Sequence, residues 1–133
     1  METVLVDSSV WVNFFRDAKT KANTYLNNNF TNIIIATCPV IMQEVLQGIV
    51  SDKDKEVVQL HFNNLNKLLE DPYAIAVEAA DLYRYLRKKG VTIRKPNDCL
   101  IAAYAIRNDI MLLEEDRDFR MMANHCALKL LNN

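Results

Sequence analysis

Short apolar runs alternate with longer amphipathic segments along this chain. Residues 3–6 and 33–35 are rich in β-branched residues, and residues 110–113 and 127–131 form two further apolar runs. Short runs that are largely apolar are typical of strands buried on both faces of a parallel sheet. The pattern therefore predicts four short buried strands.

Between these strands, apolar residues recur at helical spacing. Ser8 or Ser9 is suited to cap the first helix, Pro39 to open the third, and Gly90 to end the fifth. Residues 71–76 fit either a connection or a further short strand. The predicted helices cover residues 9–17, 19–27, 39–48, 53–69, 77–89, 96–107 and 116–123.

The alternation of strands and helices indicates an α/β fold with a mainly parallel central sheet and helices on both faces. A chain of 133 residues has room for one hydrophobic core, and two independent cores would be cramped. We therefore expect residues 1–133 to form a single α/β/α sandwich domain.

Glycine is the most informative part of the composition, because the chain has only two, Gly48 and Gly90. A dinucleotide-binding fingerprint needs three closely spaced glycines, and a P-loop needs a Gly-Lys pair. Both glycine-loop routes to a nucleotide phosphate are therefore excluded.

The cysteines and the N-terminus bear on the compartment. Cys38, Cys99 and Cys126 are odd in number and far apart, which argues against a disulfide framework or a structural zinc site and favours a reducing cytosol. The first residues lack the cationic region of a signal peptide. The longest apolar run, residues 99–106, is far shorter than the roughly 20 residues that cross a bilayer. We expect a soluble cytoplasmic protein.

Five acidic residues occupy positions that differ from an ordinary solvated surface. Asp7 follows directly on a buried strand, and Asp98 lies in the first turn of an apolar helix. Glu44 borders the apolar side of its helix, while Asp116 and Asp118 follow the strand at residues 110–113. Taken one at a time, each has a purely structural interpretation, such as a helix cap, a boundary residue or a partner of the helix dipole.

Taken together, these acids are predicted at one edge of the sheet. The carboxyl ends of parallel strands and the N-termini of the following helices meet at that edge, where α/β proteins bind ligands. Converging carboxylates raise each other's pKa unless a cation neutralises them. Oxygen ligands without His or Cys select Mg²⁺ or Mn²⁺ over zinc, so the sequence predicts a site for one of these ions.

The segments that carry these acids resemble the PIN-domain ribonucleases, and within them the VapC-type toxins of prokaryotic toxin–antitoxin pairs. The segments are VLVDSSVWVNFF, PVIMQEVLQG, RKPNDCLIAAYAI and IMLLEEDRDF. The resemblance extends nearly end to end and suits a minimal single-domain member. One departure is Glu114, which stands after a Leu-Leu pair where the family usually has Thr or Ser.

The resemblance implies a Mg²⁺- or Mn²⁺-dependent endoribonuclease that hydrolyses phosphodiester bonds of RNA, with transfer RNA as the usual family target. It also implies a cognate antitoxin and a homodimer. In this reading Asp118 assists or replaces Asp116, and Ser9 is a polar helper beside Asp7. The implied catalytic and metal-binding residues are Asp7, Glu44, Asp98 and Asp116.

Net charge alone argues against a protein surface that is basic throughout and binds nucleic acid, since the chain has 16 Lys and Arg residues and 17 Asp and Glu residues. The distribution of charge changes this picture, because residues 84–95 hold six cations and no acid. The cations at 87–89 suit the C-terminal end of a helix. Arg94 and Lys95 lead directly into Asp98 and are candidates to hold an RNA phosphate beside the metal.

Other function classes fit less well. A phosphatase with an aspartyl nucleophile needs a second Asp at position 9, which is Ser. A phosphoacceptor receiver domain needs further acids at the first strand and a lysine on another strand. One alternative stays open, a non-catalytic PIN-like module that binds RNA or protein. It stays open because Glu114 stands where the family usually has Thr or Ser.

Overall fold

Four strands and seven helices follow one another in residues 1–131, the part of the chain that the computed structural model describes. The strands are β1 (Thr3–Val6), β2 (Ile34–Thr37), β3 (Asn66–Lys67) and β4 (Met111–Leu113). The helices are α1 (Ser8–Phe15), α2 (Lys21–Asn29), α3 (Pro39–Gln47), α4 (Asp52–Asn63), α5 (Pro72–Lys88), α6 (Pro96–Arg107) and α7 (Arg117–Ala123).

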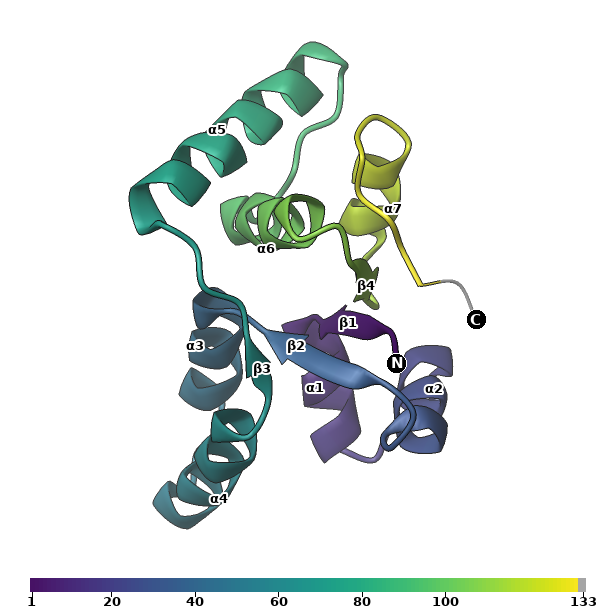
Figure 1. Ribbon diagram of the computed structural model, residues 1–133, viewed down its shortest axis with the longest axis vertical. Helices are drawn as coiled ribbons and strands as arrows, with labels where there is room; N and C mark the ends of the chain where they lie inside the picture. The colour runs from purple at the N-terminus through teal and green to yellow at the C-terminus, as the bar shows by residue number, and fades with distance from the viewer. Residues whose placement is uncertain (132–133) are drawn as a thin grey trace.

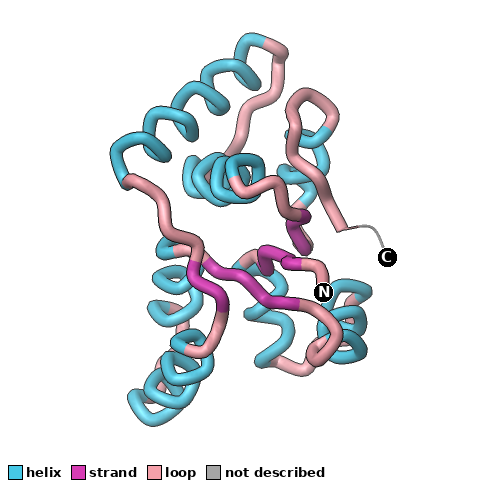
Figure 2. The backbone as a smooth tube through the Cα atoms, viewed as in Figure 1, coloured by secondary structure: helices cyan, strands magenta, loops and turns pink. Residues whose placement is uncertain are grey.

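The strands form one parallel sheet in the order β3-β2-β1-β4. Helices α1 and α2 lie on one side of the sheet and α6 and α7 on the other, and α5 packs against α6 (Figure 1; Figure 2). Val4, Leu5 and Val6 of β1 are completely buried between these layers. The predicted α/β class, with a parallel sheet covered on both faces, is therefore confirmed.

The centre of the sheet is also the point where its strand order reverses. β2 and β3 lie on one side of β1, whereas β4 lies on the other. The backbone N–H of Asp7 donates to the carbonyl of Leu113 at 3.0 Å, so the carboxyl ends of β1 and β4 are held together. Open α/β sheets bind ligands at such a point.

The helix predicted over residues 53–69 is too long. Helix α4 ends at Asn63, and the chain then extends as β3 beside β2. Leu68, whose spacing continues the helical pattern, instead donates its backbone N–H to the carbonyl of Thr37 at 2.9 Å. Pairing with the sheet overrides the local periodicity here.

Residues 71–76 form no strand, because they begin helix α5. The Asp71 carboxylate accepts the backbone N–H of Ala74 at 2.9 Å, and Pro72 occupies the first helical position. An acid that caps a helix and a proline at its first position are a strong start signal. Helix α5 therefore starts five residues before the predicted residue 77.

The predicted last strand is also wrong, since residues 127–131 contribute only an isolated bridge between Leu112 and Leu130. The first helix is capped by Asp7, whose carboxylate accepts the N–H of Ser9, and not by either serine. The helix predicted at residues 96–107 has the predicted bounds. Within residues 1–131, no helix combines the length and apolar character that a membrane crossing requires.

Candidate metal centre

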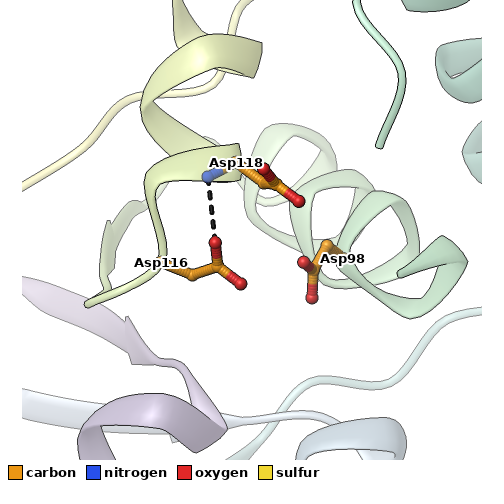
Figure 3. A group of neighbouring side chains, drawn as sticks. All are labelled: Asp98, Asp116 and Asp118. Atoms are coloured by element: carbon orange, nitrogen blue, oxygen red, sulfur yellow. Dashed lines mark hydrogen bonds between the residues drawn. The ribbon is translucent and has the colours of Figure 1, made fainter. Parts of the chain in front are cut away.

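Three aspartates converge where α6 and α7 begin. Asp98, Asp116 and Asp118 each offer a carboxylate oxygen, and these oxygens lie within 4.8 Å of one another (Figure 3). Asp98 lies in the first turn of α6, Asp116 caps α7, and Asp118 lies in the first turn of α7. Asp98 and Asp118 are buried and Asp116 is half-buried, so the group is accessible from one side.

Asp7 and Glu44 lie beside this group. The Asp7 carboxylate accepts both the backbone N–H and the hydroxyl of Ser9. Glu44, in the second turn of α3, accepts the hydroxyl of Ser8 at 3.0 Å. The charges of Asp7 and Glu44 both act on Asp98. All five acids predicted from the sequence therefore lie at one edge of the sheet, three of them within the distance of a shared ion.

Burial changes the acidity of two of these groups. Removal from water raises the pKa of Asp7 to about 6, although the hydrogen bonds from Ser9 offset part of the effect. Burial also raises the pKa of Asp98 to about 7, and the charges of Asp7 and Asp116 add to it while Lys95 opposes it. Both carboxylates therefore bind a proton or a cation more readily than a solvated acid does.

Two buried carboxylate oxygens, Asp7 Oδ1 and Asp98 Oδ2, have no hydrogen-bond partner among residues 1–131. A buried charged oxygen without a partner is costly unless a proton or cation supplies one. Carboxylate oxygens are the donors that Mg²⁺ and Mn²⁺ prefer. The residues present at this edge therefore fit a divalent cation.

Arg94 and Lys95, the predicted phosphate contacts, lie on the acids themselves. Arg94 Nε reaches Asp118 Oδ2 at 3.2 Å and Arg94 Nη2 reaches Asp116 Oδ1 at 3.4 Å. Lys95 Nζ lies 3.7 Å from Asp116 Oδ2. Their side chains are 60% and 64% exposed, so each cation has one face toward the acids and another toward solvent.

Ser9 and Glu115 belong to a network that the sequence did not reveal. Ser9 Oγ donates to Asp7 and accepts the backbone N–H of Glu115 at 3.2 Å. The Glu115 carboxylate in turn accepts hydrogen bonds from Asn13 and Thr20. The serine doublet after Asp7 is the only local signal for this network, since Glu115 and Asn13 are 102 positions apart.

Comparison with known proteins identifies the family. Residues 4–124 match the family model of the PIN domain. The chain is 34% identical over 122 residues to the VapC ribonuclease Mb1587 of Mycobacterium bovis, a match that covers 90% of this chain and 91% of that protein. Ribonuclease VapC11 of Mycobacterium tuberculosis matches with the same identity and coverage.

Solved structures show the same fold at lower identity. VapBC2 from Rickettsia felis, bound to a DNA fragment from its promoter, has a TM-score of 0.74 at 19% identity and covers 98% of both chains. VapBC-1 from nontypeable Haemophilus influenzae has a TM-score of 0.74 at 14% identity, covering 98% of this chain and 97% of that one. The chain therefore belongs to the VapC-type ribonucleases of the PIN-domain family.

Proposed function

We propose that this protein is a Mg²⁺- or Mn²⁺-dependent endoribonuclease that hydrolyses phosphodiester bonds of RNA and acts as the toxin of a type II toxin–antitoxin pair. The observation that carries the proposal is the acidic edge, where Asp7 and Asp98 each hold a buried oxygen without a hydrogen-bond donor in the described chain. The 34% identity to the VapC ribonuclease of Mycobacterium bovis supports RNA as the substrate class.

Asp7, Glu44, Asp98 and Asp116 would hold the ion. A bound Mg²⁺ or Mn²⁺ supplies stabilisation of charge on the scissile phosphate and lowers the pKa of a coordinated water. The protein's own groups prepare the ligands, because Ser9 orients the Asp7 carboxylate and Ser8 orients that of Glu44. Each serine binds one oxygen of its carboxylate and leaves the other oxygen available to a ligand.

Asp116 and Asp118 take different parts in this proposal. Asp118 Oδ2 accepts the backbone N–H of Arg94 at 3.4 Å and its side-chain Nε at 3.2 Å. Asp118 therefore anchors the segment before α6, as well as lying within reach of the ion. Asp116 is the more accessible of the two and is assigned as the ligand.

Arg94 and Lys95 would bind the RNA phosphate beside the ion. The hydrogen bond to Asp118, together with the charges of Asp118 and Asp116, raises the pKa of Arg94, whose guanidinium is charged at neutral pH in any case. Because the side chains of both residues are largely exposed, they can meet a phosphate without leaving the acids. Phosphate contacts of this kind supply affinity without reading the base sequence.

RNA cleavage by the purified protein tests the function. We expect cleavage with Mn²⁺ or Mg²⁺, none in EDTA, and a loss of at least about a hundredfold in Asp98→Asn, because a ligand of the ion is removed. Asp54→Asn is the matched control. Asp54 is exposed on α4, so this variant should cleave RNA like the wild type.

Full cleavage in EDTA would contradict the metal-dependent mechanism. RNA binding without cleavage under every metal condition would instead favour a non-catalytic PIN-like module. These two results are distinguishable by a gel-shift assay run beside the cleavage assay.

The same family membership supports a proposal for the partners of this chain. Several similar structures were solved as VapBC complexes, so we propose a small cognate antitoxin for this chain that covers the acidic edge. We also propose a homodimer, which is argued below from the exposed residues of α5. The cytoplasmic location predicted from the cysteines stays a prediction.

A further inference from the structure

Hydrogen bonds link four charged residues, at positions 114, 116, 118 and 120, in the turn that carries Asp116. Glu114 Oε2 accepts the backbone N–H of Asp116 at 2.8 Å, and Asp116 Oδ1 accepts the backbone N–H of Asp118 at 3.0 Å. Arg120 Nη1 closes the group by donating to both oxygens of Glu114, at 3.2 and 3.0 Å. Asp116 is therefore held from both sides, through its backbone and through its carboxylate.

Glu114 depends on Arg120 because it is largely buried. The Glu114 side chain is 9% exposed, whereas that of Arg120 is 57% exposed. A buried carboxylate that loses its charged partner is driven to turn toward water. Such a turn removes the acceptor that holds the backbone of Asp116.

We propose that Glu114 and Arg120 form a positioning pair for the metal ligand Asp116, so that an exposed arginine on α7 sets the affinity of the site for its ion. The inference rests on the proposed function and deepens it. Partners that orient metal ligands typically change metal affinity by roughly 10- to 100-fold when removed. Glu114 stands where the resemblance leads one to expect Thr or Ser, so this pair is a feature of this chain.

The direction in which the metal affinity changes when Arg120 is replaced distinguishes a positioning role from simple electrostatics. Replacing Arg120 by Gln removes a positive charge close to a cation site, and Coulomb's law alone then predicts tighter binding of a divalent ion. Loss of positioning predicts weaker binding. The two explanations therefore differ in direction as well as in size.

The test is calorimetric titration of Mn²⁺ into the metal-free full chain. We expect Arg120→Gln to weaken Mn²⁺ binding by roughly 10-fold or more, while Arg120→Lys restores it, because one Arg120 nitrogen makes both contacts. Arg117→Gln is the matched control: Arg117 is exposed on the same helix and forms no ion pair in residues 1–131. Its affinity should equal or exceed that of the wild type.

A second pair of variants isolates the hydrogen bond to Asp116. Glu114→Gln and Glu114→Ala remove the same charge, but only Gln keeps an oxygen that can accept the Asp116 N–H. We expect Glu114→Ala to bind Mn²⁺ roughly 10-fold more weakly than Glu114→Gln. Circular dichroism and thermal unfolding in EDTA show which variants are folded before titration.

Unchanged or tighter Mn²⁺ binding by Arg120→Gln would overturn the positioning role. Equal affinities of the two Glu114 variants would do the same. Failure of the proposed function has a different signature, because the wild type would then bind Mn²⁺ no better than Asp98→Asn. RNA cleavage by the wild type, measured in parallel, separates the two failures.

Discussion

Asp7 and Asp98 are 91 positions apart in the sequence, yet each has a buried oxygen without a hydrogen-bond donor in the described chain. Ser9 satisfies one oxygen of Asp7 and leaves the other unpaired. A charged group in this state destabilises the fold when it is ionised and has no counter-ion. These residues therefore couple metal binding to stability.

The free energy of unfolding of the metal-free protein should fall as pH rises. The folded chain holds protons on Asp7 up to about pH 6 and on Asp98 up to about pH 7. The unfolded chain releases them near pH 4, so the folded state binds more protons between these values. At about 1.4 kcal/mol per pH unit, Asp7 alone lowers the stability by roughly 3 kcal/mol across its window.

Urea unfolding in EDTA between about pH 4 and about pH 7 measures this slope. Saturating Mg²⁺ should flatten it, since an ion bound only by the folded state stabilises that state. The double variant Asp7→Asn, Asp98→Asn should also lose the slope. Stability that rises with pH in EDTA would contradict the burial of these two acids.

At the scale of elements, the connection from α5 to α6 brings the basic segment to the acids. Gly90 follows α5 with φ of +82°, a left-handed conformation that ends the helix. Val91 and Ile93 then bury their side chains, and Arg94 reaches Asp118. The reversal at Gly90 therefore determines where the proposed phosphate contact lies.

Gly90→Ala should destabilise the protein by about 1 kcal/mol, because an L-residue is strained in the left-handed region. No atom lies within 4 Å of the added Cβ, so the cost comes from the backbone and not from a clash. Gly48→Ala is the control, with φ of −82° and its nearest atoms at 3.7 Å. It should be neutral or stabilising by up to roughly 1 kcal/mol.

Chemical unfolding of both variants measures the difference. Equal stabilities of Gly90→Ala and Gly48→Ala would contradict the role of the positive φ. A weaker affinity of Gly90→Ala for RNA, with the metal affinity unchanged, would tie the turn to the placement of Arg94.

At the scale of the whole molecule, α5 and the residues just before it leave several apolar side chains uncovered. Ile75 and Leu86 are buried against the rest of the protein, whereas Tyr73 is 84% exposed and Val77, one turn later, is 60% exposed. Leu69, just before the helix, is 87% exposed. Exposed apolar residues are typical of interaction surfaces, and the proposed homodimer would use these residues.

Light scattering after size exclusion should give the mass of two chains for the wild type and of one chain for the double variant Tyr73→Glu, Val77→Glu. Charges placed in an apolar interface oppose association. Val50→Glu is the control, because Val50 is 98% exposed in the connection between α3 and α4. A monomeric wild type would contradict the proposed homodimer.

The sequence by itself determined strands β1, β2 and β4, most helices and the placement of acids after strands or early in helices. Asp7 and Asp116 follow apolar strands, and Asp98 opens an apolar helix, all of which are local patterns. Because parallel strands share one carboxyl edge, the common location of these acids followed from topology alone. Local pattern is sufficient there, since burial repeats with the period of the helix or strand.

Only the tertiary structure decided which partners the charged groups meet. Arg94 lies on Asp118 across 24 positions, Glu115 accepts from Asn13 across 102, and Leu68 pairs with β2 instead of extending α4. The unpaired oxygens of Asp7 and Asp98 are likewise invisible in the sequence. Hydrogen-bond partners depend on distances between segments that are remote along the chain, and packing alone sets those distances.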